Sequence, residues 1–210
     1  MAPVLIVSVL LATAWTPPPS DQDRLETCLS AIQDDAEDAY EDALTWRYQG
    51  GGWPAEHCVS LALIALGQEA PGALRLREAA LDAEMASDPS RAIMLGQSGD
   101  AFLDAEEYDQ ALISFTAALD FAPHDAGLLA GLARTHLSLE DFNAAEDAAS
   151  LALSQDDARP LIWRLRAEAR LGLQAYDEAL SDIEAARALS PEDIDILVLR
   201  GRIIDARRTG

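Results

Sequence analysis

A period of 34 residues runs through most of this 210-residue sequence and constrains its fold more than any other feature. An aromatic residue recurs at Tyr108, Phe142 and Tyr176, each 34 positions after the one before. Three further series keep the same interval: Ala111, Ala145 and Ala179; Ala118, Ala152 and Ala186; and the closing residues Pro89, Pro123, Asp157 and Pro191. Coincident series at one spacing indicate stacked copies of a single supersecondary unit.

Each period has the pattern of two paired helices. The first helix alternates large and small residues by turns, as at Leu95, Gly99 and Phe102 in its first copy. The small residue allows the second helix to approach closely, and the large ones fill the space beside it. The second helix opens at the recurring aromatic residue, and proline stops it or starts the next helix. The sequence therefore predicts an all-α fold.

This spacing and these residues resemble the tetratricopeptide-repeat (TPR) family over residues 92–208. The resemblance implies a right-handed α-solenoid of antiparallel helical hairpins. We expect three TPR units followed by a single capping helix and tail, at 92–125, 126–159, 160–193 and 194–210. The last helix is expected to present a polar outer face that keeps the array in solution.

Several positions depart from the family pattern, and two of them are Ala149 and Ile183, which replace the aromatic residue kept at Phe115. Asp157 replaces the closing proline, and His136 and Arg170 replace the aromatic residue of the first helix. These changes loosen individual units without disturbing the period.

Residues 22–91 continue the pattern in a degraded form. The apolar stripes and breaks predict two divergent helical hairpins, and thus about eleven helices in the whole chain. The four expected helices span 22–33, 35–48, 54–68 and 73–87.

The first 14 residues have the features of a secretory signal peptide. An apolar run ends in Ala12-Thr13-Ala14, which predicts cleavage after Ala14 and a disordered linker at 15–21. We therefore expect a periplasmic or secreted protein without stable membrane insertion after cleavage, similar to small exported TPR proteins of Gram-negative bacteria. The alternative is a cytoplasmic protein with an uncleaved apolar start.

The two cysteines, Cys28 and Cys58, gain interest from the predicted export. Both lie on the first helices of neighbouring hairpins, which pack side by side in this architecture, and an oxidising compartment allows a disulfide. In a cytoplasmic protein they would instead be two reduced, buried small residues.

The charge of the chain excludes one class of partner. It holds 37 acidic and 15 basic residues, a net charge of −22. Such a charge repels the phosphate backbone, so no nucleic acid is expected to bind.

Catalytic and metal-binding patterns are missing from the sequence. His57 and Cys58 are adjacent and point about 100° apart on a helix, while a structural zinc needs four ligands. We find no nucleophile with a base and no nucleotide fingerprint. The sequence predicts a protein that is not an enzyme and has no cofactor and no metal.

The concave wall of a TPR array is built by the first helices. The inward positions expected to form a partner-binding groove are Asp100, Leu103, Arg134, Leu137, Arg164, Glu168, Leu171, Val198 and Arg202. One hypothesis is that Arg134, Arg164 and Arg202 form a basic track for a peptide carrying acidic groups. The alternative is that Arg164 pairs with Glu168 one turn later and the other two arginines are solvated.

The family's carboxylate clamp for chaperone tails is not matched here. Gly96, Asp100 and Gly131 stand where that clamp needs cationic or amide side chains. The expected function is a protein-interaction scaffold or adaptor in the bacterial cell envelope that binds a peptide or protein in the groove. A regulatory or accessory subunit of an envelope enzyme complex is the alternative, and a homo-oligomer is compatible with either.

Overall fold

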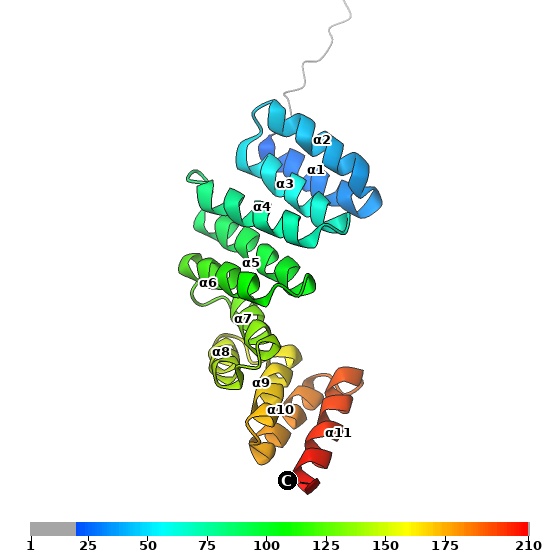
Figure 1. Ribbon diagram of the computed structural model, residues 1–210, viewed down its shortest axis with the longest axis vertical. Helices are drawn as coiled ribbons and strands as arrows, with labels where there is room; N and C mark the ends of the chain where they lie inside the picture. Colours follow the sequence, from blue (N-terminus) through cyan, green and yellow to red (C-terminus); the bar gives the residue numbers. More distant parts are fainter. Residues whose placement is uncertain (1–19, 210) are drawn as a thin grey trace, which may run out of the picture.

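A computed structural model describes residues 20–209 of the chain, and this part is an α-solenoid of eleven helices (Figure 1). The helices are α1 (Asp21–Asp34), α2 (Ala36–Tyr48), α3 (Gly52–Ala65), α4 (Glu69–Asp82), α5 (Asp88–Asp104), α6 (Tyr108–Phe121), α7 (Ala126–Ser138), α8 (Phe142–Gln155), α9 (Pro160–Gly172), α10 (Tyr176–Leu189) and α11 (Ile194–Thr209). The predicted signal peptide at 1–14 and residues 15–19 of the predicted linker lie outside the described residues.

Local side-chain chemistry sets the start of most helices. Ser20 and Asp23 form a capping box at α1, so this helix begins at Asp21, inside the segment predicted as a linker. Asp35 caps α2, and Asp125 caps α7 through two backbone N–H groups. Each such cap satisfies backbone donors that have no partner within the helix.

A turn with one residue in the left-handed region joins the two helices of each repeat. Its φ angle is 58° at Glu106, 57° at Glu140 and 62° at Gln174. These residues are 34 positions apart, so the turn geometry repeats with the sequence. None is a glycine, although glycine adopts this region most readily.

The boundaries around α4 differ from those predicted. We expected a helix at 73–87, whereas α4 spans Glu69–Asp82. Gly67 adopts a φ of 77° after α3, which ends the helix early and leaves Pro71 in the first turn of α4. Pro89, expected to follow a helix, instead lies in the first turn of α5, which Ser87 caps.

The core is distributed along the solenoid. Each helix packs mainly against its neighbours in sequence, and the buried alanines and leucines form successive clusters. Figure 1 shows the result, with α1–α3 at one end of an elongated molecule and α11 at the other. Stability therefore depends on the contacts between adjacent repeats.

An ion network adds to the apolar packing between α8, α9 and α10. Arg170 occupies the aromatic position of its repeat and donates to Glu146 and Asp182, each at 2.7 Å. Arg166 contacts both oxygens of Asp182, at 2.9 and 2.7 Å. Because Asp182 is almost fully buried, the two arginines supply the neutralisation that a carboxylate needs away from water.

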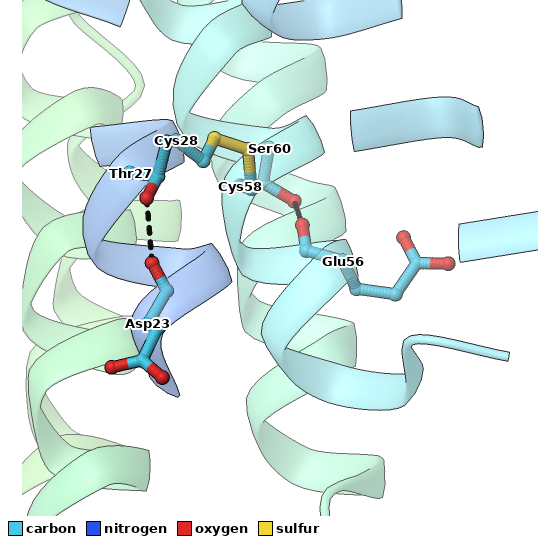
Figure 2. The surroundings of a disulfide bond; sticks show 6 residues. All are labelled: Asp23, Thr27, Cys28, Glu56, Cys58 and Ser60. Carbon is cyan, nitrogen blue, oxygen red and sulfur yellow. Dashed lines mark hydrogen bonds between the residues drawn. A yellow bond between two sulfur atoms is a disulfide. The ribbon is translucent and has the colours of Figure 1, made fainter. Parts of the chain in front are cut away.

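The first helix is attached to the array in an unusual way. Helix α1 has no fully buried residue, and a disulfide joins its Cys28 to Cys58 of α3, with the Cα atoms 6.2 Å apart (Figure 2). Cys58 itself is buried in the cluster that contains Trp46 and Val59. The bridge therefore connects a surface helix to the core of the next hairpin.

The last helix differs from the polar cap that we expected. Its outer face exposes Ile194, Leu197, Val198 and Ile204, because no helix within residues 20–209 covers it. None of the helices in this part of the chain has the length and apolar character required to cross a membrane.

Candidate functional site: a groove lined by the first helices

A groove of about 510 Å³ runs across α5, α7 and α9. These are the first helices of the three repeats. Its apolar lining includes exposed Ile93 and Leu161, with the buried ring of Phe115 between the helices. Small residues complete the surface at Gly96, Gly127, Ala130 and Gly131.

Glycine keeps the floor of this groove open. A Cβ atom at Gly96 would lie 2.6 Å from Cδ2 of Leu128, and one at Gly131 would overlap the ring of Phe115. A Cβ atom at Gly99 of α5 would lie 2.7 Å from the same ring. The ring of Phe115 therefore rests against two first helices at once, which brings α5 and α7 close enough to share one groove.

Charged residues in the groove neutralise each other. Asp100 on α5 and Arg134 on α7 form an ion pair across the two helices. Partial removal from water raises the pKa of the Asp100 carboxyl above its ordinary value, and the Arg134 guanidinium opposes that rise. Glu168 and Arg202 repeat the arrangement between α9 and α11, with Nη1 of Arg202 3.5 Å from Oε1 of Glu168.

These four residues occupy one repeat position. Asp100, Arg134, Glu168 and Arg202 are each 34 residues apart and alternate in sign. Because of this alternation, Asp100 pairs with Arg134 and Glu168 pairs with Arg202. Half-exposed ion pairs of this kind contribute little stability, but they set the charge pattern of the concave surface.

The structure brings together only part of the predicted site. Asp100 and Arg134 line the groove, whereas Leu103, Leu137 and Leu171 are half-buried against the core clusters. Arg164 and Glu168 are half-buried on α9, and Val198 and Arg202 are exposed on α11, beyond the groove. Glu168 pairs with Arg202 and not, as the alternative hypothesis predicted, with Arg164.

Sequence reasoning missed the residues that give the groove its apolar character. Ile93, Gly127 and Leu161 share one repeat position and line the groove together. Asp125 and Arg159 share another and lie at the same surface. The 34-residue period would have revealed both sets, because positions that face one groove recur with the repeat.

A buried histidine supports the wall of the groove from behind. Nε2 of His57 on α3 donates to Oε1 of Gln97 on α5 at 2.7 Å, and Gln97 lines the groove. Burial lowers the pKa of His57, and the hydrogen bond to Gln97 opposes that fall. His57 therefore positions the wall and is too deeply buried to act on a ligand in the groove.

The arrangement is suited to binding. The groove offers apolar side chains, open backbone at glycines and the ion pair of Asp100 with Arg134. Within residues 20–209 no three His, Cys, Asp or Glu side chains gather as a metal centre requires. The fold and the groove together define a TPR solenoid.

Comparison with known proteins gives the same class. Residues 102–169 match the family model described as tetratricopeptide repeat. The matched segment thus carries tetratricopeptide repeats, and it holds α6, α7, α8 and most of α9.

Among curated proteins, human RNA polymerase II-associated protein 3 is 27% identical over 108 residues. That match covers 51% of this chain and 16% of the relative, so the chain spans about a sixth of the relative's length. A solved TPR protein of Thermus thermophilus is 20% identical, with a TM-score of 0.58 over 89% of this chain and 98% of its own.

One solved relative contains a bound peptide. The first TPR domain of Spaghetti, bound to the HSP90 peptide SRMEEVD, is 25% identical to this chain. Its TM-score is 0.54 over 56% of this chain and 94% of that domain. This related TPR domain therefore binds a short peptide of another protein.

Proposed function

We propose that this protein is a non-enzymatic interaction scaffold that binds a peptide segment of another protein in the groove across α5, α7 and α9. The observation that carries the proposal is the groove itself, with Ile93 and Leu161 exposed beside glycine backbone. Exposed apolar residues in a concave surface are the usual anchors of peptide binding. The peptide bound by the related Spaghetti domain supports the same role.

The groove favours a peptide with apolar anchors over a strongly acidic one. Arg134 is already paired with Asp100, so an acidic group on the partner would have to displace that carboxylate. Asp100 and glycines 96 and 131 stand where a chaperone-tail clamp needs cationic or amide groups. We therefore infer a partner whose affinity comes from burying apolar side chains on Ile93 and Leu161.

Replacing Ile93 and Leu161 together by glutamate tests this assignment. Peptides are first selected from a random phage-displayed library on the wild-type protein, and their affinity is then measured by fluorescence polarisation. We expect at least a tenfold weaker Kd for the double variant, about 1.4 kcal/mol or more. Both side chains are exposed, so the fold should persist.

The matched control is Leu151→Glu on α8, which is exposed and does not line the groove. It changes the same chemistry on another surface and should leave the Kd unchanged. Equal binding by the groove variant and this control would overturn the assignment of the groove as the peptide site.

We further propose that the protein is exported to the periplasm or beyond the cell and that the bridge between Cys28 and Cys58 forms there. Helix α1 has no fully buried residue and packs only through half-buried side chains such as Leu25, so the bridge adds to a modest packing contact. A reducing cytoplasm would leave that helix weakly held. The bridge to α1 therefore supports the proposal that the protein works in an oxidising compartment.

Replacing both cysteines by serine should release α1. The bridge closes a loop over a separation of 30 residues, which corresponds to about 3.5 kcal/mol by the chain-entropy estimate. Hydrogen exchange followed by mass spectrometry should show faster exchange in 21–34 and little change in α7–α10.

The intact mass of protein purified from its native host, with and without reduction, tests the export and the bridge together. A full-length mass with two free thiols would contradict both.

A further inference from the structure

Helix α11 carries apolar residues on two opposite faces, and the outer face ends in the exposed ion pair of Asp205 with Arg208. Ile196, Leu199 and Ile203 point into the core cluster shared with α9 and α10 and are buried. The other face leaves Ile194 73%, Leu197 45%, Val198 57% and Ile204 40% exposed. At 100° per residue these four positions lie within about 120° of arc, centred on Gly201. A helix of this pattern is normally covered on both sides.

The repeat shows what covers the equivalent face elsewhere. Leu197, Gly201 and Ile204 are the counterparts of Leu95, Gly99 and Phe102 in α5, three repeats earlier. There Leu95 and Phe102 are buried, because α6 packs against α5 as the second helix of the hairpin. Helix α11 is therefore the first helix of a hairpin whose second helix is missing from residues 20–209.

The space beside Gly201 indicates which side chain the missing helix would place there. In α5 the ring of Phe115 on α6 lies against Gly99, 2.7 Å from the position of a Cβ atom. A Cβ atom at Gly201 would meet nothing within 4 Å. The face of α11 thus has a notch that suits one bulky apolar side chain, flanked by small residues as Ala111 and Ala118 flank Phe115.

The charge of the chain also changes at this end. Residues 1–159 contain 28 acidic and 7 basic residues, whereas residues 160–210 contain 9 and 8. The last repeat and α11 are thus almost neutral beside a strongly acidic body. A partner that carries acidic groups outside its apolar stripe, as α6 and α10 do, meets no net repulsion here.

We propose that the outer face of α11 is a docking seat for an amphipathic helix of another protein. That helix carries small residues at positions i and i+7 and a bulky apolar residue at i+4, and it completes the hairpin as α6 completes the first one. A second copy of α11 suits the seat less well. Antiparallel pairing would place Gly201 opposite Gly201 and leave the notch unfilled.

The probe is a synthetic peptide with the sequence of residues 106–122, which covers α6 and contains Phe115. We expect the fluorescently labelled peptide to bind the full chain. Leu197→Glu with Ile204→Glu should weaken binding at least tenfold, and so should Gly201→Leu, which fills the notch. Because the space beside Gly201 is open, the thermal midpoint of G201L should equal or exceed that of the wild-type protein. Leu151→Glu is again the matched surface control.

A tethered version keeps the test decisive if the free peptide folds too weakly to bind. The same helix is appended after residue 209 through the native α5–α6 turn, which raises its effective concentration to the millimolar range. We expect slower hydrogen exchange in 194–209, and no protection when the appended helix carries alanine in place of its phenylalanine. Equal exchange in both fusions would overturn the proposal.

Sedimentation of the wild-type chain shows whether the seat binds a partner helix or a second copy of this chain. A monomer that binds the peptide supports a partner helix. A dimer that Leu197→Glu dissociates would instead assign the seat to a second copy and overturn the proposal. The groove variants at Ile93 and Leu161 should bind the α6 peptide normally, so failure of the seat and failure of the groove can be told apart.

Discussion

Replacing Asp182 by alanine should lower the free energy of unfolding by about 3–5 kcal/mol. Its carboxylate accepts from Arg166 and Arg170 and is almost fully buried between α9 and α10. Removing it leaves two guanidinium groups facing each other with only Glu146 to compensate. The thermal midpoint, followed by circular dichroism, should fall by about 10 °C for a chain of this size.

Asp177→Ala on the same helix is the control. Asp177 is exposed and pairs with Arg207 at 2.9 Å, so its loss should change stability by less than about 1 kcal/mol. Similar midpoints for the two variants would show that the buried network is not what holds α9 against α10. Asp182→Asn, which keeps the shape and loses the charge, should lie between them.

The repeats could be predicted from the sequence because their signal is periodic. Tyr108, Phe142 and Tyr176 open α6, α8 and α10. The turns before these helices were harder to predict, since a glutamate or glutamine adopts the left-handed conformation where the sequence offers no glycine as a signal. Neighbouring repeats impose that conformation on each turn.

The sequence predicted that the first helices line a groove, but it did not predict which charged residues pair across them. The pairing that we considered for Arg164 lies within one helix, where i,i+4 contacts are easily read from the sequence. The pairs that form join adjacent first helices across 34 residues. Such contacts become visible only when residues are compared between repeats as well as along the chain.

The ends of the array departed most from expectation. The degraded hairpins carry few periodic residues, so the bounds of α4 were displaced by Pro71 and Pro89. At the other end, Leu197 and Ile204 occupy positions that are core in a complete repeat. The sequence predicted a single last helix, but it did not predict that Leu197 and Ile204 would form an exposed apolar surface on that helix.

Phe115→Ala should have an effect as large as that of Asp182→Ala, about 3–5 kcal/mol, for a different reason. The buried ring contacts α5 at Gly99 and α7 at Gly131. Its removal leaves a cavity between two repeats and removes part of the groove floor. Urea unfolding should show the lost stability, and peptides selected on the groove should bind at least tenfold more weakly. Ile113→Ala, exposed on the same helix, should change both by little.

A double-mutant cycle of Phe115→Ala and Gly131→Ala measures the coupling between the ring of Phe115 and the glycine of α7 that it contacts. In the wild-type background Gly131→Ala should destabilise the protein, because the added Cβ overlaps the buried ring. In the Phe115→Ala background the ring is gone, and the same change should stabilise α7 by up to about 1 kcal/mol through helix propensity. A reversal of sign is the expected outcome, since coupled neighbours are not additive. Equal effects in both backgrounds would mean that the ring does not determine how closely α6 approaches α7, and the account of the groove floor would be wrong.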